Sequence, residues 1–269
     1  MSRDHRPPSR VAILSDPHGD AVALDRVISH LESCEPVDEV LVGGDLTQGG
    51  PQPAEVVDMI RARGWRSVRG NADDLLFRIA DGISPVDAAR PGESAHGGPL
   101  PEATAARAVW SVEQLGPERI DYLRSLPMSI QLGPYPFGRV VLVHATPWST
   151  EDVVLPDADI EVAQRMVQEA GARLLVYGHI HTQYVRKVGA AALASVGAVS
   201  GSNDADPRPA YAVIGLGATI SIEHRRVDWP AGERLAAYQR AGVEPLPERD
   251  QPGPFPIRSQ PGIAVTIWP

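Results

Sequence analysis

The first half of the chain alternates short apolar runs with amphipathic segments. Apolar runs occur at residues 11–15 (VAILS), 39–45 (EVLVGGD) and 65–71 (WRSVRGN). The segments between these runs place apolar residues at the three- and four-residue spacing of a helix. Pro53 suits the first turn of the second such helix, and Gly64 suits its C-terminal end. The pattern predicts a βαβαβ unit, in which parallel strands are joined by right-handed crossovers.

The second half of the chain begins with a similar pattern and then changes. Strands are expected at 139–145 (RVVLVHA) and 173–181 (RLLVYGHIH), with a helix between them that ends at Gly171. After the second strand, YVRKVG pairs naturally with AAALASVG as a hairpin, and YAVIGLG pairs with ATISIEHRRV. Antiparallel hairpins that follow a parallel unit predict a second, mixed sheet packed on the first. The expected fold class is therefore α/β, with two mixed sheets.

Three segments depart from this alternation. Residues 81–101 are rich in Gly, Pro and Ser and lack periodicity, which favours a surface loop or a lid. Residues 102–127 predict two short helices, the second of which begins at Pro117. Residues 244–269 are rich in proline and are expected to be extended rather than helical.

These segments suggest one domain over residues 1–243, with a loop and helical insertion at 81–127 and a proline-rich tail at 244–269. The chain has 269 residues, a formal net charge of −9 and one cysteine, Cys34. The N-terminal segment MSRDHRPPSR lacks the apolar region of a signal peptide, and no apolar run approaches a membrane helix. We therefore expect a soluble, cytoplasmic protein that binds neither membranes nor nucleic acid, and we leave a homo-oligomer open.

Polar side chains that can bind metal ions follow the apolar runs, at the point where each strand is expected to end. They are Asp16, His18, Asp45, Asn71, His144, His179 and His181. The carboxyl ends of parallel strands meet at one edge of a sheet, and ligands bind at that edge. We therefore expect these seven side chains to lie close together.

Each of these residues alone has an ordinary structural explanation. An Asp after a strand is usually a turn or N-cap residue, and a His on an apolar strand is usually a hydrogen-bonded core residue. Together they supply carboxylate, amide and imidazole ligands, which suit borderline and hard divalent ions. Seven ligands are too many for one ion, so the set predicts two ions that share a bridging carboxylate.

The blocks SDPHGD, VGGDL, RGN, VHA and YGHIH, in this order, resemble the signature of the calcineurin-like metallophosphoesterases. The stretch GDLTQGGPQPAEVVDMI is similar to a bacterial and archaeal branch that is often labelled diadenosine-tetraphosphatase-like. The resemblance covers residues 11–240. It implies a four-layer α/β/β/α sandwich with a dinuclear metal site at the C-terminal strand ends.

The resemblance also implies a role for each residue. Asp16, His18 and His181 would hold one metal, and Asp45 would bridge the two. The second metal would be held by Asn71, His144 and His179. The divalent ions would be Mn, Fe, Zn, Ni or Co, with Mn favoured, and Asp45, Asn71 and His144 are also assigned to catalysis.

The activity implied is hydrolysis of small phosphoesters or nucleotides by a hydroxide held between the two ions. A Ser/Thr protein phosphatase and a catalytically idle metal-binding scaffold remain the alternatives. Many family members read G-N-H-[DE], where this chain reads RGNADD, so Ala72 replaces a histidine that lies near the leaving group. General acid help at that position is therefore in doubt.

Two residues are predicted to bind substrate. His96 lies in the 81–101 loop and is expected to replace the missing acid if that loop closes over the substrate; the alternative is a solvated loop histidine. Arg208 is the only cation of residues 200–211 and could bind a second phosphate in a bidentate fork. The alternative for Arg208 is a surface ion pair with Asp204 or Asp206.

Overall fold

The computed structural model describes residues 8–88, 100–229, 231–246 and 264–267. The first half of the chain forms β1 (Arg10–Leu14), α1 (Ala21–Ser33), β2 (Glu39–Val42), α2 (Pro53–Ala62), β3 (Arg66–Ser67), α3 (Asn71–Ala80), α4 (Pro85–Ala88) and α5 (Glu102–Ser125). The second half forms β4 (Ser129–Tyr135), β5 (Gly138–Val143), α6 (Ile160–Ala170), β6 (Leu174–Tyr177), β7 (Gln183–Val188), β8 (Ala191–Val196), β9 (Ala210–Leu216), β10 (Ile220–Arg226), α7 (Ala231–Ala241) and β11 (Ala264–Ile267).

The first sheet has six strands in the order β11-β10-β9-β1-β2-β3. β1 and β2 are parallel, as are β2 and β3, which confirms the predicted βαβαβ unit. The β9–β10 hairpin also forms as predicted, but it joins this first sheet, because β9 pairs antiparallel with β1. The expectation that both hairpins build the second sheet is therefore wrong for β9 and β10.

The second sheet has five strands in the order β4-β5-β6-β8-β7. β5, β6 and β8 run parallel, and β7 and β4 pair antiparallel at the two edges. The β7–β8 hairpin confirms the prediction for that segment. β4 was not expected, although its alternating exposed and buried positions are typical of a strand at the edge of a sheet.

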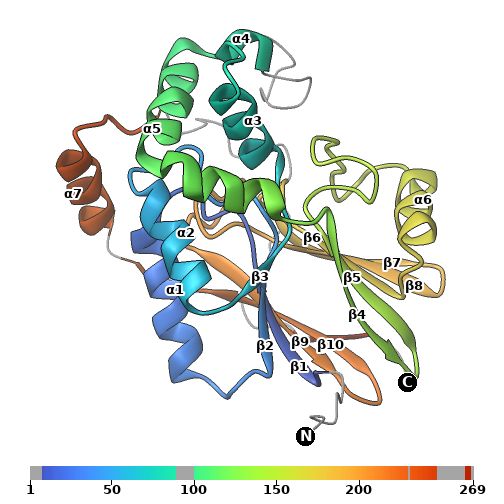
Figure 1. Cartoon of the computed structure of the whole chain (residues 1–269). Helices are drawn as coiled ribbons and strands as arrows, with labels where there is room; N and C mark the ends of the chain where they lie inside the picture. Colours follow the sequence, from blue (N-terminus) through green and yellow to red (C-terminus); the bar gives the residue numbers. More distant parts are fainter. Residues whose placement is uncertain (1–7, 89–99, 230, 247–263, 268–269) are drawn as a thin grey trace, which may run out of the picture.

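The two sheets pack face to face, and helices cover their outer faces (Figure 1). The apolar layer between the sheets includes Ile13 and Leu41 from the first sheet and Leu142 and Val176 from the second. A second apolar cluster lies between the first sheet and α1, α2, α3 and α5, and a third lies between the second sheet and α6. The structure is therefore the α/β/β/α sandwich that the sequence implied.

The chain around Asn71 differs from its prediction as the end of a strand. The third strand consists of Arg66–Ser67 only, and Asn71 is the first residue of α3. Asp73 explains where the helix begins, because its Oδ2 accepts a hydrogen bond from the N–H of Gly70 at 3.1 Å. A carboxylate in this position satisfies one of the amide groups that a helix start leaves unpaired. The polar side chain of Asn71 is thereby fixed on a helix end beside the sheet.

The segments outside the two sheets follow the predictions in part. The helical insertion contains two helices that meet at a kink, where Gly116 has φ 64° and is followed by Pro117, as expected. Residues 85–88 form a short helix within the predicted loop, and α7 was not expected. β11 pairs with β10, so this part of the tail is extended as predicted. Within the described residues, none of the helices combines the length and apolar character that crossing a membrane requires.

Candidate metal centre

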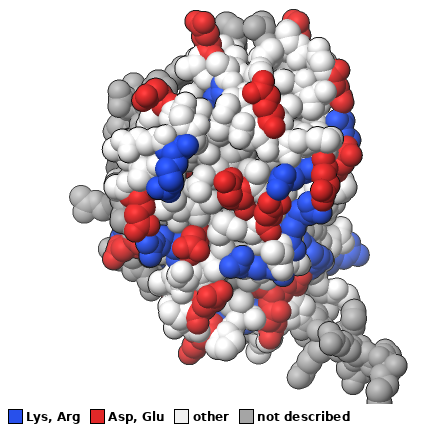
Figure 2. Space-filling view, turned by 60° about the vertical axis from the view of Figure 1, so that its left-hand side comes forward, with Lys and Arg blue, Asp and Glu red and all other residues white. Residues whose placement is uncertain are grey.

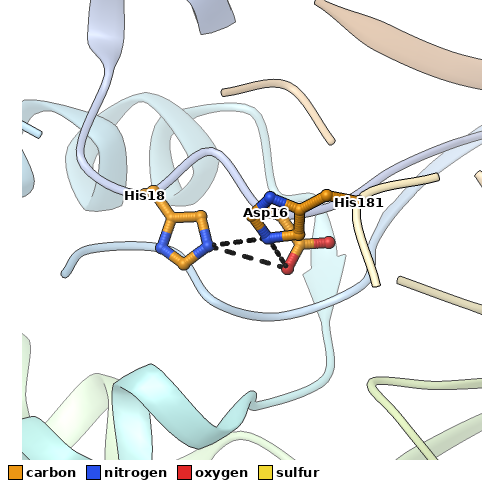
Figure 3. Close-up of side chains that lie close together, drawn as sticks. All are labelled: Asp16, His18 and His181. Atoms are coloured by element: carbon orange, nitrogen blue, oxygen red, sulfur yellow. Dashed lines mark hydrogen bonds and ion pairs between the residues drawn. The ribbon is translucent and has the colours of Figure 1, made fainter. Parts of the chain in front are cut away.

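Asp16, His18 and His181 form one group of potential metal ligands. The Nε2 atoms of His18 and His181 lie 3.1 Å apart. Asp16 Oδ1 lies 3.3 Å from His181 Nε2 and 3.8 Å from His18 Nε2. Figure 3 shows the two rings and the carboxylate turned toward one another, with Asp16 and His18 on the loop after β1 and His181 on the loop after β6. Residues 163 positions apart in the chain therefore meet at this point.

A second group contains Asp45, Asn71, His144 and His179. A ligand atom from each of Asp45, His144 and His179 lies within 4.8 Å of the others. Asn71 joins this group, because its Oδ1 lies 3.0 Å from His144 Nε2. The two groups together contain all seven residues that the sequence singled out as ligands.

Asp45 lies between the two groups. Its Oδ2 is 3.6 Å from His18 Nε2 in the first group, and its Oδ1 is 3.4 Å from His144 Nε2 in the second. The peptide N–H of Ala72 donates to Oδ1 at 2.8 Å and fixes the orientation of the carboxylate. One carboxylate thus faces both groups, as a bridging ligand would.

The backbone is strained at most of these residues. Among the described residues, those with a positive φ that are not glycine are Asp16, His18, Asp45, His179 and His181, with φ between 47° and 62°. The left-handed region is unfavourable for side chains with a Cβ, and such strain is concentrated at functional sites. The five residues belong to the loops that leave β1, β2 and β6, so the tight turns aim the side chains of three strand ends into one space.

Two glycines are required by the close approach of these loops. A Cβ added to Gly178 would lie 2.5 Å from Asp16 Oδ2, and a Cβ added to Gly70 would overlap the carboxylate of Asp45. Any side chain at either position would displace a candidate ligand. The glycines that accompany the polar residues in the sequence motifs therefore have a steric reason at these two positions.

Backbone carbonyls fix the orientation of the imidazole rings. The Nδ1 atoms of His18, His144 and His181 face the carbonyl oxygens of Gln48, Gly43 and Gly201 at 2.8, 2.7 and 2.5 Å. A carbonyl oxygen only accepts, so each Nδ1 donates and each Nε2 is turned toward the centre. Histidines that bind metals are commonly oriented in this way.

His179 is oriented by the opposite nitrogen of its ring. Its Nε2 donates to the carbonyl oxygen of Glu151 at 3.2 Å, which leaves Nδ1 as the atom that can act as a ligand. The four histidines therefore present one nitrogen each toward the candidate ions.

The residues of the first group fit a metal ion on chemical grounds. If the Nδ1 atoms of His18 and His181 carry the protons, their Nε2 lone pairs face each other at 3.1 Å beside the buried carboxylate of Asp16. Among the described residues, none donates a hydrogen bond to Asp16 Oδ1. Lone pairs and a negative charge that converge in this way repel one another unless a cation lies between them. A divalent ion supplies that cation, and its preferred ligands are nitrogen and oxygen atoms of these types.

The pKa of His144 is shifted in the opposite direction to the pKa values of His18 and His179. Burial lowers the pKa of His18, and burial together with the charge of His144 lowers the pKa of His179 to about 4. Burial works in the same direction at His144, but the attraction and hydrogen bond of Asp45, the charge of Asp16 and the carbonyl of Gly43 together exceed it and raise the pKa of His144 to about 10. Without a metal ion, a proton on His144 therefore balances the charge of Asp45.

Asp73 was not singled out in the sequence, although it organises the centre. Its Oδ1 accepts from the N–H of Leu46 at 2.9 Å, and its Oδ2 accepts from the N–H of Gly70. It thereby joins the loop after β2 to the start of α3. Burial, helped by the charge of Asp45, raises the pKa of Asp73 to about 7. Its position three residues after Gly70, where a carboxylate can cap a helix, is the sequence signal that could have identified it.

The two predicted substrate-binding residues have different outcomes. His96 lies outside the described residues. Arg208 Nη2 lies 2.7 Å from Asp206 Oδ2, and its Nη1 lies 3.0 Å from Asp228 Oδ1. The alternative of a surface ion pair is thus present at Asp206, and the role of Arg208 in binding substrate stays a prediction.

A cavity of about 280 Å³ opens beside the first group. His18 and His181 form part of its lining, and Trp229, Arg234 and Tyr238 form another part. Sequence reasoning missed these last three residues, because it predicted no helix at 231–241. The aromatic residues spaced nine positions apart, 229 and 238, with an arginine between them, were the available signal.

The comparisons with solved structures agree with this fold. A metallophosphoesterase from Sphaerobacter thermophilus superposes with a TM-score of 0.64 and 24% identity, over 87% of this chain and 95% of that chain. A hypothetical protein from Pyrococcus horikoshii superposes with a TM-score of 0.72 and 16% identity, over 87% of this chain and 94% of that chain. A comparison with curated proteins found no match.

A family model supports a statement beyond the fold. The model of the calcineurin-like phosphoesterase superfamily domain matches residues 10–218, which include all seven candidate ligands. The match extends over most of the chain, from β1 to the end of the β9 strand. The chain therefore belongs to the calcineurin-like phosphoesterase superfamily.

Proposed function

We propose that this protein hydrolyses small phosphoesters with two divalent metal ions bound at the candidate centre. The observation that carries the proposal is the position of Asp45, whose two oxygens face His18 and His144 at 3.6 and 3.4 Å. Asp16, His18 and His181 would hold one ion, and Asn71, His144 and His179 would hold the other. When bound, two such ions supply a nucleophile at neutral pH and neutralise the charge that develops on a phosphoryl group.

The remaining contributions come from the chain itself. Carbonyl groups hold His18, His144 and His181 in the orientation that points Nε2 inward, so the binding of ions requires little rearrangement of the rings. His144 must give up its proton before Nε2 can act as a ligand. At position 72 the chain offers only its peptide N–H, which is already bonded to Asp45. No side-chain proton is therefore available there for a leaving group.

The distribution of charges on the surface favours a small substrate over a nucleic acid. Figure 2 shows basic and acidic side chains interspersed on the face that it displays, rather than a continuous basic field. Binding to the phosphate backbone of a nucleic acid depends on such a field. With a net charge of −9, the chain favours a substrate that the ions themselves attract.

The test is hydrolysis of p-nitrophenyl phosphate and bis(p-nitrophenyl) phosphate by protein loaded with one defined metal at a time. We expect Mn²⁺ to support the highest turnover, a chelator to abolish it, and added metal to restore it. Metal content is measured on the same samples. Two bound ions without turnover on either substrate would favour the catalytically idle scaffold, and preferential turnover of phosphoserine or phosphothreonine peptides would favour a protein phosphatase.

A further inference from the structure

The cavity beside the first ligand group is bounded by two distant parts of the chain. One wall comes from the loops after β1, β2 and β8 and includes His18, Gln48 and Ser200. The opposite wall comes from residues 229–246 and includes Trp229 and Tyr238. Its volume of about 280 Å³ lies just below the range of small-molecule pockets, roughly 300–1,000 Å³, which suits part of a ligand such as one ring.

Arginines fix the second wall in place. The guanidinium carbon of Arg234 lies 5.4 Å from the ring centre of Trp229 and 5.5 Å from that of Tyr238. Arg234 Nε also lies 2.8 Å from Oδ2 of the buried Asp20 at the start of α1. Cation–π contacts and a partly buried ion pair together restrict how these rings can move.

Arg107 extends the same arrangement to α5. Its guanidinium carbon lies 5.6 Å from the ring centre of Tyr238. Its Nη1 donates to the carbonyl oxygen of Gly49 and its Nη2 to that of Glu244, each at 2.5 Å. Gly49 follows Gln48, whose carbonyl orients His18. The aromatic wall is thus connected through one buried arginine to the loop that holds a candidate metal ligand.

The surfaces exposed in the cavity suit a planar ring. Trp229 is half-buried, so part of its indole remains accessible beside the guanidinium of Arg234. Aromatic rings and guanidinium planes both stack on planar heteroaromatic groups with little dependence on their substituents. Ser202 and Asn203 also line the cavity, where Ser202 donates to Asp204 and Asn203 donates to the carbonyl of Ile180, so the amide oxygen of Asn203 is the group that can accept from the edge of such a ring.

The cavity also has the right position for part of a substrate. His18 and His181 belong both to its lining and to the candidate metal centre. A phosphoryl group held at the ions would therefore point one substituent into the cavity.

We propose that this cavity binds a planar aromatic or heteroaromatic ring that is attached to the phosphoryl group, so that the substrates are ring-bearing phosphoesters such as nucleotides. The inference rests on the proposed function for the location of the phosphoryl group. Trp229 is the residue on which the ring stacks, and Arg234 and Tyr238 hold it in position.

The experiment measures equilibrium binding of adenosine monophosphate and of ribose 5-phosphate to the Mn²⁺-loaded protein. The two ligands carry the same phosphomonoester, and only the first has a planar base. We expect the nucleotide to bind about tenfold more tightly, because stacking of one base contributes roughly 1–3 kcal/mol. In Trp229→Ala this preference should disappear, and in Trp229→Phe most of it should remain.

Trp65→Ala is the matched control, because Trp65 and Trp229 are both half-buried and pack against the same apolar cluster. Trp65 does not line the cavity, so its replacement should preserve the preference. Equal affinity of the wild-type protein for the two ligands would overturn the proposal. Loss of the preference in Trp65→Ala as well as Trp229→Ala would also overturn it, since the effect would then be structural.

The binding comparison requires no turnover. If the wild-type protein prefers the nucleotide but hydrolyses neither p-nitrophenyl phosphate nor bis(p-nitrophenyl) phosphate with any metal, the proposed function fails and the ring subsite stands. If it hydrolyses p-nitrophenyl phosphate without preferring the nucleotide, the subsite fails and the proposed function stands.

Discussion

The two halves of the candidate metal centre differ in their access to solvent. In the half formed by Asp16, His18 and His181, the histidine side chains are 18% and 14% exposed and border the cavity. In the other half, the side chain of His144 is fully buried, and Asn71 lies at the start of a packed helix. Both histidines of the first half therefore border the cavity, while in the second half Asp45, Asn71 and His144 are buried and His179 is partly exposed. Changes in the two halves should consequently have different effects.

Replacement of the residue that the halves share should have the largest effect. We expect Asp45→Asn to lower activity by more than about 100-fold, because even residues that only orient a ligand cost roughly 10–100-fold when changed. Metal content should fall at both positions. The measurements are metal analysis and turnover of p-nitrophenyl phosphate. Near-wild-type turnover with two ions bound would show that Asp45 does not bridge the halves.

The position that lacks a general acid, Ala72, belongs to the buried half, because it directly follows Asn71. General acid catalysis contributes typically 10²–10⁴-fold, so its absence should penalise leaving groups that need a proton. We expect kcat/KM for aryl and anhydride-type phosphates to exceed that for alkyl phosphates by about this factor. The check is a plot of kcat/KM against leaving-group pKa. A flat plot with rate-limiting chemistry would mean that another group donates the proton.

The free energy of unfolding should distinguish a substitution in the buried half from one in the accessible half. In metal-free protein, His144→Ala removes the counter-charge of the buried Asp45, and breaking such a pair costs about 3 kcal/mol or more. His181→Ala removes a ring that faces the buried Asp16 but is itself 14% exposed, so water can replace it, and we expect a smaller loss in the free energy of unfolding than for His144→Ala. Denaturant unfolding in the presence of a chelator measures both. Equal losses would contradict the division into an accessible and a buried half.

Arg208 should give the smallest effect. Its side chain is 36% exposed and is paired with Asp206 and Asp228, and exposed ion pairs contribute about 0–1 kcal/mol. Arg208→Ala should leave KM for p-nitrophenyl phosphate within about twofold of the wild-type value. A selective increase in KM for dinucleoside polyphosphates, restored in part by Arg208→Lys, would instead support the predicted second-phosphate contact.

The fold could be predicted where strands that are close in the sequence also pair with one another. The strands β1 and β2 are continuous apolar runs with an amphipathic helix between them, and they pair as expected. The position of the β9–β10 hairpin was not predictable in the same way. Its sequence specifies a hairpin, but which sheet it extends depends on β9 meeting β1, some 200 residues earlier in the chain.

The candidate centre was predictable to a similar degree. The seven polar residues follow apolar runs and share recognisable motifs, and the structure brings all seven together. The cavity wall was not predictable, because Trp229 and Tyr238 acquire their role only when α7 packs beside α1. Asp73 could have been identified from its capping position, but its contact with Leu46 depends on the tertiary fold.

The distribution of these residues along the chain has a consequence for protein engineering. The candidate ligands lie between Asp16 and His181, and the aromatic wall is contributed by residues 229–246. A chimaera that exchanges only residues 229–246 would retain the whole ligand set and change the residues that face the substituent in the cavity. The candidate ligands and the aromatic wall are thus encoded in consecutive stretches of the chain, so the preference for a substituent can be altered through residues 229–246 without changing a candidate ligand.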